Sequence, residues 1–451
     1  MGPNGFKRPE ETAARVIRTY LTTSGLFTLA TALIWGINTL FLLEAGLDIF
    51  EIMLVNSLYS VGQVLFEIPT GVIADTVGRK ISFLFGIVTL TLSTLLYLAS
   101  ASFGWGILGF SAGSIMLGLG YTFQTGAVDA WLVDALDALG HEGRKDAVFA
   151  RGGFVFGIAM LIGTIAGGLL GQVDLALPYM VRSAILVIAF TATFMLMHDI
   201  GFNPRPLQVS HFAAETRVIF NAGMRFGWRN PVVRPLLLAS AAQGSFFMYF
   251  FYAAQPYILK LLGRPDLIWV SGAFAAMFGL SSMIGNLCVN LVTRSRWGAS
   301  APRVLTTGAA VFSVLACIAG LSGLFAPAEG SITGFVSLVI TMFLIGILMG
   351  VIGPISQGYI NAHIPSKHRA TVLSVDSFFA DAGGALGQPS FGWLSRAFSI
   401  PTAYIVGSFV TIIAAPLYAR SGREAEVCID LNEAGECIPP GSRKPIDSLE
   451  I

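Results

Sequence analysis

The feature that most constrains this chain is a succession of long apolar segments separated by short polar stretches. A helix that crosses a membrane needs about 20 mostly apolar residues, and segments of that length recur along the whole sequence. The 451 residues are 54% hydrophobic and only 12% charged, which leaves too little polar surface to cover several soluble domains. The sequence therefore predicts an all-α integral membrane protein that is surrounded by membrane lipid.

We predict twelve spans in two groups of six. The predicted spans are 18–45, 49–74, 81–102, 106–137, 146–172, 177–199, 232–262, 267–293, 303–325, 332–361, 370–396 and 400–420. The longest polar interruption defines the predicted domains: an N-terminal six-helix bundle (1–200), a cytoplasmic linker (201–230), a C-terminal six-helix bundle (231–421) and a polar cytoplasmic tail (422–451). Gly163 and Gly168 recur at the same spacing as Gly387 and Gly392, which suggests an internal repeat of the two halves.

The basic residues predict the orientation in the membrane. An even number of spans places both termini on one side, together with most of the Lys and Arg residues of the connecting loops. The opposite side receives only Arg182, Lys260, Arg264 and Arg396. By the positive-inside rule, both termini are expected in the cytoplasm, and the plasma or inner membrane is the expected location.

A dense charged turn, GVIADTVGRK at residues 71–80, separates the second and third predicted spans. Asp, Arg and Lys each cost about 2.5 to 3.5 kcal/mol at the centre of a membrane helix, so this turn must lie at the water interface. Gly71 is expected to permit close approach of a neighbouring helix, and Gly78 to permit a sharp reversal. Arg79 and Lys80 would anchor the cytoplasmic side.

Gly71, Asp75, Gly78, Arg79 and Lys80 match the GxxxDxxGRK pattern between the second and third helices of the major facilitator superfamily, which this chain resembles. The resemblance implies twelve helices in two pseudo-symmetric six-helix bundles and transport by alternating access, without enzymatic activity. It also implies that the aspartate faces helix eleven and that the arginine pairs with an acid at the end of helix four, which closes the cytoplasmic gate. Asp134 is the acid that we expect to pair with Arg79.

The predicted fifth span contains GIAMLIGTIAGG and is similar to the GPxxGG motif of the 12-helix drug:proton antiporter branch. Thr164 stands where that motif has proline, so only the glycines carry over. Simple helix packing explains the same glycines equally well: Gly157, Gly163, Gly167 and Gly168. Helix four departs further from that branch, because no Lys or Arg occurs between Lys80 and Arg144.

Carboxylates inside spans are the natural candidates for proton coupling, because they are costly to bury and can exchange a proton as access changes. Asp381 lies about 15 Å along its span, near the middle of the membrane. Asp129 lies deeper in helix four than Asp134 and faces away from it. Glu67 could take part either in proton coupling or in the gate. Asp376 lies near the start of its span, where the helix dipole would help to keep it ionised, so a structural role is favoured over proton coupling.

In the resembled fold, helices one, four, seven and ten line the cavity. Aromatic and amide side chains there can bind an amphipathic molecule by stacking and hydrogen bonds, although each is more often a packing or helix-bridging residue. The candidates are Trp35, Asn38, Tyr121, Gln124, Gln243, Tyr249, Tyr252, Gln255, Gln357 and Asn361. Only Arg182 could be a basic residue within a span, so phosphorylated substrates are disfavoured.

The sequence thus favours a proton-coupled exporter of small amphipathic or drug-like molecules, monomeric and driven by the proton gradient without a cofactor. The nearest alternative is a proton symporter that imports a nutrient or metabolite on the same scaffold. More remote alternatives are an intramembrane aspartyl protease using Asp129 and Asp381, and a transporter-like receptor. A net charge of +1 gives no reason to expect nucleic-acid binding. Four cysteines show no disulfide framework or metal-ligand spacing, and we expect them to be reduced.

Overall fold

The computed structural model describes residues 12–202, 224–295, 298, 300–327, 330–364, 369–428, 430–431 and 437–438. Most of the predicted linker and most of the predicted tail therefore lie outside the described residues. The described part is almost entirely helical. The exception is a pair of two-residue strands, β1 (Asp430–Leu431) and β2 (Cys437–Ile438), which are antiparallel.

The helices follow the predicted spans closely. In the first half they are α1 (Ala13–Trp35), α2 (Asn38–Glu44), α3 (Ile49–Thr76), α4 (Arg79–Phe103), α5 (Gly106–Gln124), α6 (Ala127–Ala138), α7 (Lys145–Gly171) and α8 (Leu177–Leu196). In the second half they are η2 (Met224–Trp228), α10 (Val233–Leu262), α11 (Trp269–Arg294), α12 (Ala301–Leu324), α13 (Ile332–Ala362), α14 (Arg369–Ala397), α15 (Ile400–Thr411) and α16 (Ala414–Val427). The first helix begins earlier and the last ends later than we predicted.

Three of the predicted spans are broken in the structure. The first becomes α1 and α2, which meet at a bend of 48°. The fourth becomes α5 and α6, which are separated by Gly126 in the left-handed conformation (φ +73°). The last becomes α15 and α16. The breaks matter for the site, because a broken helix exposes backbone groups and changes the direction of the side chains that follow.

Ten helical segments among the described residues are long and apolar enough to cross a membrane, and the bent pair α1 and α2 makes an eleventh. The remaining predicted span corresponds to α14, a helix of 29 residues. It falls outside this set, and its sequence contains Asp376, Asp381 and Arg396. The all-helical membrane fold is therefore established, whereas the twelfth crossing stays a prediction that depends on α14.

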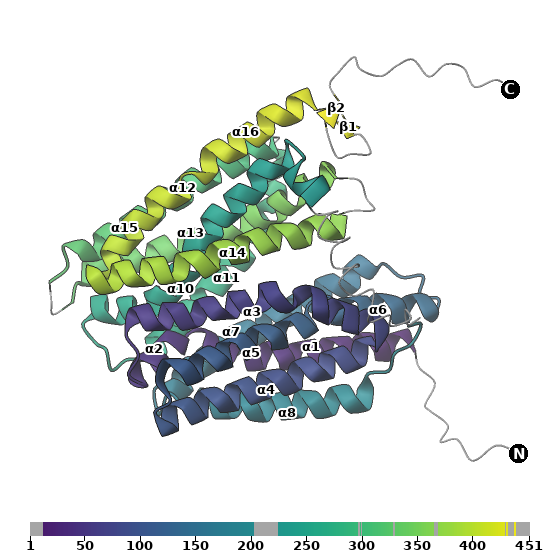
Figure 1. Ribbon diagram of the computed structural model, residues 1–451, viewed down its shortest axis with the longest axis horizontal. Coiled ribbons are helices and arrows are strands. Elements are labelled where there is room, and N and C mark those ends of the chain that lie inside the picture. The colour runs from purple at the N-terminus through teal and green to yellow at the C-terminus, as the bar shows by residue number, and fades with distance from the viewer. Residues whose placement is uncertain are drawn as a thin grey trace, which may run out of the picture.

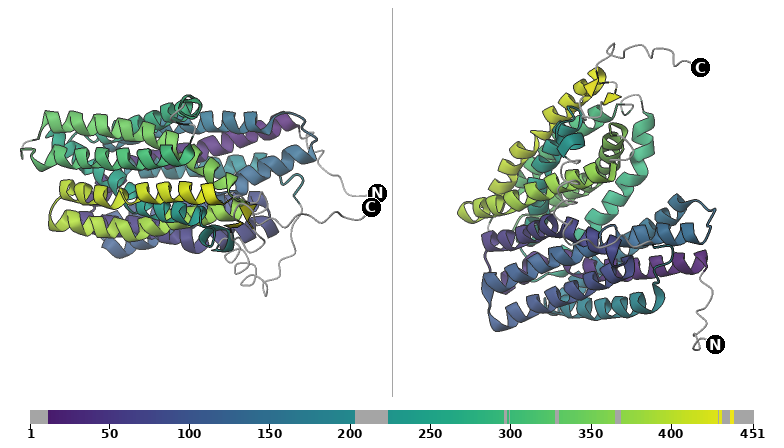
Figure 2. Two further views of the ribbon diagram at one scale, coloured as in Figure 1. Left: turned by 90° about the horizontal axis from the view of Figure 1, so that it is seen from above. Right: turned by 45° about the vertical axis from the view of Figure 1, so that its right-hand side comes forward.

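The helices form two groups that lie side by side, α1–α8 in one and α10–α16 in the other (Figure 1). We call the end where α1 begins, α3 turns into α4 and α16 terminates the motif end. The other end, which carries α2 and the connections from α10 to α11 and from α14 to α15, is the opposite end. The two groups diverge toward the motif end, and Figure 2 shows the same divergence from another direction.

The two groups are held together at the opposite end. The rings of Trp35 and Phe251 stack with centroids 4.3 Å apart. The Ser271 hydroxyl donates to the carbonyl of Gly36 at 2.6 Å. Asp48, which caps the start of α3, forms an ion pair of 3.1 Å with Arg396 at the end of α14. These contacts join the two groups at the opposite end, whereas the helices of the two groups diverge toward the motif end.

The outer surface carries large exposed apolar side chains, as expected for helices that face lipid. Examples from both groups are Leu92, Leu108, Leu169, Leu287 and Leu386, all more than half exposed. A soluble protein would rarely expose so many large apolar side chains on adjacent helices. The protein is therefore an integral membrane protein whose apolar exterior contacts the bilayer.

The expectation for the cysteines was wrong at one position. Cys288 and Cys317 are free, as expected, but Cys428 at the end of α16 is disulfide-bonded. The antiparallel pairing of β1 with β2 reverses the chain just beyond α16. Sequence spacing alone does not reveal such a reversal.

Candidate functional site

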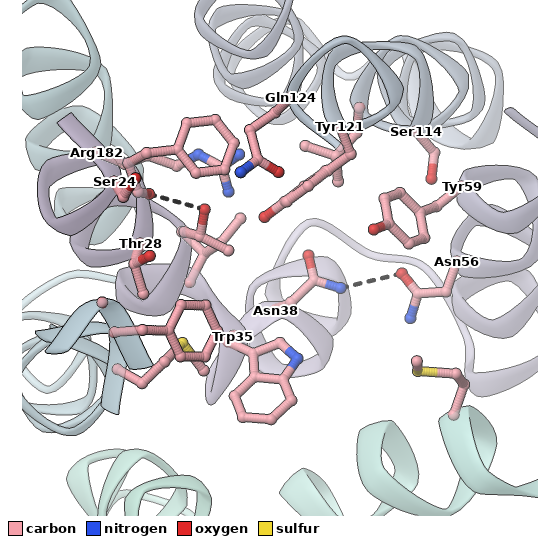
Figure 3. Close-up of a pocket in the computed structure, with 18 of the residues that line it drawn as sticks. Ser24, Thr28, Trp35, Asn38, Asn56, Tyr59, Ser114, Tyr121, Gln124 and Arg182 are labelled. Carbon is pink, nitrogen blue, oxygen red and sulfur yellow. Dashed lines mark hydrogen bonds between the residues drawn. The ribbon is translucent and has the colours of Figure 1, made fainter. Parts of the chain in front are cut away.

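A cavity of about 570 Å³ lies between the two groups of helices (Figure 3). Its walls come mainly from α1 to α8, and Met248 and Tyr252 of α10 are its only lining residues from the second half among the residues described. The lining extends from Tyr20 and Asp129 toward the motif end to Trp35 and Asn38 near the opposite end. A volume of this size accommodates a drug-sized molecule.

A buried amide network forms the end of the cavity near α2. Asn38 is the first residue of α2, so the break after α1 turns its side chain inward. Its amide donates to Asn56 Oδ1 at 3.0 Å, and its own Oδ1 accepts from the Tyr179 hydroxyl at 2.9 Å. These bonds fix the orientation of the Asn38 amide in the cavity wall.

Aromatic rings supply most of the apolar lining. Tyr121 packs edge-to-face against Tyr59 at 5.5 Å and against Phe27 at 5.8 Å between centroids. Tyr252 and Trp35 line the side that faces α10. Rings of this kind offer flat apolar surface, and the tyrosine hydroxyls add polar contacts, which suits an amphipathic ligand.

Asp129 lies in the first turn of α6, next to the left-handed Gly126. Its side chain is exposed, lines the cavity and accepts a hydrogen bond of 3.0 Å from the Tyr20 hydroxyl. The helix break thus turns Asp129 toward the cavity, whereas Asp134 on the same helix approaches Arg79.

Half of the predicted substrate residues line the cavity: Trp35, Asn38, Tyr121, Gln124 and Tyr252. The others lie elsewhere in the described structure: Gln243, Tyr249, Gln255, Gln357 and Asn361. The predicted set took four residues from the first half and six from the second, but the cavity is walled mostly by the first half. Helix rotation and the asymmetric opening of the two groups decide this outcome.

Three of the five predicted residues that lie outside the cavity make packing contacts. Tyr249 is fully buried and hydrogen-bonds Ser395 of α14. Gln243 accepts a hydrogen bond of 3.1 Å from the Tyr418 hydroxyl of α16. Gln255 is 2% exposed and bonds to the backbone around the break between α1 and α2. In the described structure these three residues make contacts that pack or bridge helices.

Gln357 and Asn361 lie near the motif end of α13. Gln357 is exposed and Asn361 is partly buried, and neither lines the cavity in this conformation. The two groups of helices are spread apart at this end, which separates α13 from the cavity walls of the first half.

The carboxylates considered for proton coupling are divided between the two halves. Glu67 is exposed on α3 and accepts a hydrogen bond of 3.3 Å from the Thr125 hydroxyl. Asp381 is partly buried on α14 and lies close enough to Glu67 for the two charges to repel each other. Asp376 instead accepts a hydrogen bond of 2.6 Å from Ser240 on α10. The pair Glu67 and Asp381 thus faces across the boundary between the halves.

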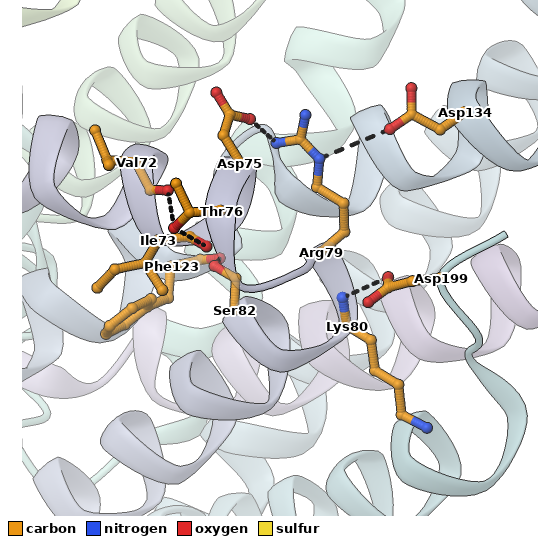
Figure 4. Close-up of polar contacts among 10 residues, drawn as sticks. All are labelled: Val72, Ile73, Asp75, Thr76, Arg79, Lys80, Ser82, Phe123, Asp134 and Asp199. Carbon is orange, nitrogen blue, oxygen red and sulfur yellow. Dashed lines mark hydrogen bonds and ion pairs between the residues drawn. The ribbon is translucent and has the colours of Figure 1, made fainter. Parts of the chain in front are cut away.

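The gate motif forms a charged cluster within the first half (Figure 4). Arg79 pairs with Asp75 at 2.7 Å and approaches Asp134 of α6 at 3.8 Å. The Lys80 ammonium donates to the carbonyl of Phe194 at 2.7 Å. In this conformation the cluster joins α3, α4, α6 and α8 to one another.

Asp199, which sequence reasoning did not consider, completes this cluster. Its carboxylate accepts the backbone N–H of Lys80 at 2.9 Å, in the first turn of α4 (Figure 4). The cap residue of α4 is Gly78, which has no side chain to satisfy that turn, so Asp199 serves as the cap from a distant part of the chain. Burial raises the pKa of the Asp199 carboxyl, and the Lys80 N–H partly offsets this effect.

The two motif glycines behave differently. Gly78 has φ +132°, a conformation that L side chains rarely adopt, and a Cβ there would lie against the Asp199 carboxylate. Gly71 was expected to allow close approach of a neighbouring helix, but no atom of another helix lies within 4 Å of the position its Cβ would occupy. The divergence of the two groups at the motif end leaves the Gly71 surface open in this conformation.

The glycines of α7 allow close approach on two sides. Cβ atoms at Gly163 and Gly167 would collide with α1, and one at Gly157 would lie 2.7 Å from Met283 of α11. A Cβ at Gly168 would lie 2.8 Å from the Cα of Gly272 on α11. The α7 glycines therefore pack helices both within the first half and between the halves.

Arg182 is the cavity residue that sequence reasoning missed as a ligand contact. It lies on α8, is 1% exposed and is directed toward the cavity interior (Figure 3). The available signal was an arginine within an apolar span, which above counts only against phosphorylated substrates. Among the described residues, no group of three or more His, Cys, Asp or Glu side chains is arranged to hold a metal.

The sequence matches the family model of the Major Facilitator Superfamily over residues 20–323 and 301–427. YxaM of Bacillus subtilis (strain 168), described as an MFS-type transporter, is 23% identical over 413 residues, which cover 88% of this chain and 93% of YxaM. The class E tetracycline resistance protein of Escherichia coli is 32% identical over 143 residues, about a third of either chain.

Solved structures of transporters share the fold. The nucleoside transporter NupG has a TM-score of 0.72 at 12% identity, covering 90% of this chain and 98% of NupG. A POT family transporter in complex with a thioalcohol conjugated peptide has a TM-score of 0.71 at 12% identity, and the match covers 91% of this chain and 96% of that transporter. This chain belongs to the major facilitator superfamily, and it is a membrane transporter and not an enzyme.

Proposed function

We propose that this major facilitator transporter exports small amphipathic molecules in exchange for protons, by alternating access in the plasma or inner membrane. The observation that carries the proposal is the cavity of about 570 Å³ with aromatic and amide walls, placed between halves that separate at one end only. By the positive-inside rule, the distribution of basic residues supports a cytoplasmic location for that end, the motif end. A cavity open to the cytoplasm can load cargo from inside the cell.

Export is favoured over import by two relatives named for tetracycline resistance. The class E protein of Escherichia coli and the class H protein of Pasteurella multocida match 33% and 46% of their own lengths, at 32% and 25% identity. Resistance of that kind is consistent with removal of a compound from the cell. The rival hypothesis, a proton symporter for a nutrient, uses the same cavity with the opposite direction of net flux.

Proton coupling rests on the carboxylates at the boundary between the halves. Glu67 and Asp381 belong to different halves, so any rocking of the halves changes the distance between their charges. Their mutual repulsion is weaker when one of them carries a proton, which links the proton to the conformation. Asp129, exposed in the cavity, is a third group that could exchange a proton with water.

Everted membrane vesicles with an imposed pH gradient test this function directly. Tetracycline is the first compound to assay, followed by a panel of amphipathic dyes. We expect accumulation in vesicles that contain the protein and its loss when a protonophore collapses the gradient. Flux that is indifferent to the gradient would remove the proton from the mechanism. Gradient-driven uptake into intact cells, with none into everted vesicles, would replace export by symport.

A further inference from the structure

A buried cation without an anionic partner lies in the wall of the central cavity. Arg182 is 1% exposed, and its Nε and Nη2 atoms are buried with no hydrogen-bond acceptor among the described residues. No described carboxylate lies within ion-pair distance of it. Removing a charged group from water without a partner costs several kcal/mol, so the fold retains Arg182 at a considerable cost in stability.

The groups around Arg182 are polar but uncharged. Tyr59, Tyr97 and Tyr252 line the same cavity as Arg182. Tyr179 stacks against Tyr97 with ring centroids 6.1 Å apart. Phenol hydroxyls provide dipoles, but they cannot neutralise a guanidinium. A negative charge that met the guanidinium would therefore have to come from a bound molecule.

We propose that Arg182 binds a carboxylate of the transported molecule, so that the substrates are organic monoanions with an aromatic or apolar body. The proposal deepens the transport function above and rests on it. A guanidinium presents two parallel N–H donors to a carboxylate, a geometry that gives both affinity and orientation. Nε and Nη2, the two atoms without acceptors, form one such edge of the guanidinium.

The composition of the cavity argues for a single negative charge. Arg182 is the one Lys, Arg or His among the residues that line it in the described structure. A phosphate or dicarboxylate would bring a second charge with no cation to meet it. Asp129, exposed on the side toward the motif end, would repel a dianion more strongly than a monoanion as it entered.

The remaining lining selects the body of the molecule. Trp35, Phe27, Tyr59 and Tyr121 present ring faces and edges, and the amides of Asn38 and Gln124 add hydrogen-bonding groups. The volume of about 570 Å³ falls within the usual range for drug-sized ligands. An aromatic ring system carrying one carboxylate satisfies both parts of the site.

Equilibrium binding to the purified full-length protein tests the proposal. The probes are aromatic carboxylates paired with the primary amides of the same skeleton: indole-3-acetate, naphthalene-2-acetate and biphenyl-4-acetate. Thermal shift titrations at neutral pH give an apparent Kd for each. We expect acids to bind more tightly than their amides, by about tenfold or more, because a hydrogen bond to a charged group is worth about 1.5 to 3 kcal/mol.

Two substitutions separate the charge of Arg182 from its geometry. Arg182→Gln is expected to abolish the preference for acids while leaving amide binding unchanged. Arg182→Lys keeps the charge but loses the paired donors, so an intermediate preference is expected. Arg151→Gln is the matched control, because Arg151 is exposed on α7 beside the cavity residue Gly152 and should leave the preference intact.

Equal binding of acids and amides to the wild-type protein would overturn the proposal, as would an undiminished acid preference in Arg182→Gln. If Arg182→Gln does not fold, Arg182→Lys decides: full retention of the wild-type acid affinity would contradict bidentate binding. The measurement uses no ion gradient. Failure of proton coupling in vesicles would therefore leave this result standing, and the two proposals can fail separately.

Discussion

Gln255 of α10 and Trp35 of α1 are joined by a partly buried hydrogen bond that crosses between the two halves. The Gln255 amide donates to the carbonyl of Trp35 at 3.0 Å, and its Oε1 accepts the backbone N–H of Thr39 at 2.9 Å. One side chain thereby satisfies both sides of the break between α1 and α2. Because Gln255 is 2% exposed, water cannot readily replace it.

Gln255→Leu should therefore favour opening of the opposite end. The substitution removes the partners of the Thr39 N–H and the Trp35 carbonyl, and a loss of about 1 to 3 kcal/mol would shift the ratio of conformations about 5- to 150-fold. Distances between spin labels placed at Glu44 and Arg264, both exposed near that end, would measure the shift. We expect a larger population of long distances.

Gln172→Leu provides the control for that experiment. Gln172 also bonds across the halves, donating to the carbonyl of Asp266 at 2.8 Å and accepting from Trp269 N–H at 3.2 Å. It is exposed, so water can take over both bonds and the effect should be small. Equal distance distributions for the two variants would contradict the importance of burial at Gln255.

Asp381→Asn should reduce proton-driven flux by about tenfold or more, whereas Asp376→Asn should retain most of it. No hydrogen bond or ion pair to Asp381 is found among the described residues, and its neighbouring charge is Glu67 in the other half. In Asp376→Asn the amide oxygen can still accept the hydrogen bond from Ser240. Vesicle flux with and without a pH gradient measures both.

Energy-independent counterflow of labelled substrate serves as the control for these variants. It should persist in Asp381→Asn, because exchange without net proton movement needs no coupling group. Full gradient-driven activity in both variants would show that neither carboxylate carries the proton.

Arg79→Gln should impair transport far more than it lowers stability. Partly exposed ion pairs such as those of Arg79 with Asp75 and Asp134 contribute about 0 to 1 kcal/mol, so the Tm should change by only a few degrees. The charge is expected to be needed when the motif end closes. Vesicle flux and the Tm of the purified protein would be compared.

Lys145→Gln is the matched variant for Arg79→Gln. It removes an exposed ion pair with Asp137 at the same end of the molecule, outside the gate motif, and should leave flux unchanged. A flux loss of similar size in both variants would indicate a general effect of charge at this end and would count against a specific gate.

Asp199→Asn should change how stability depends on pH. Burial raises the folded-state pKa of Asp199 above its unfolded value of about 3.9, so the native state holds the proton more tightly. The stability that this group contributes is present below the unfolded pKa and is lost as pH rises through the folded pKa. Relative to the variant, the wild-type Tm should therefore fall as pH rises from about 3.5 to 7. Parallel pH profiles would contradict the shift.

The span positions could be predicted because hydropathy is a local property of the chain. The ranges expected for α3, α4, α7 and α11 differ from the observed helices by only one to a few residues. The need for glycine at position 78 was also predictable, because the chain must reverse sharply in a charged turn between two spans. By contrast, the breaks at Gly36 and Gly126 lie inside apolar stretches, and hydropathy gives no sign of them.

The membership of the cavity could be predicted only in part. Trp35, Asn38 and Tyr121 were found from the helices on which they lie. Gln255 and Tyr249 occupy equally plausible helical positions, yet helix rotation places one at the interface between the halves and the other in the core. Asp199 and Arg182 were missed because their partners, or lack of partners, depend on residues far away in the chain.

By itself, the sequence determined that this chain must fold as membrane-spanning helices with a charged turn at the interface, because the cost of placing charge in lipid acts on each segment separately. Only the tertiary structure decided which end is closed, which side chains face the cavity and which charge is left without a partner. These properties depend on helix rotation, on helix breaks and on contacts between distant residues, and none of them is a property of a single segment.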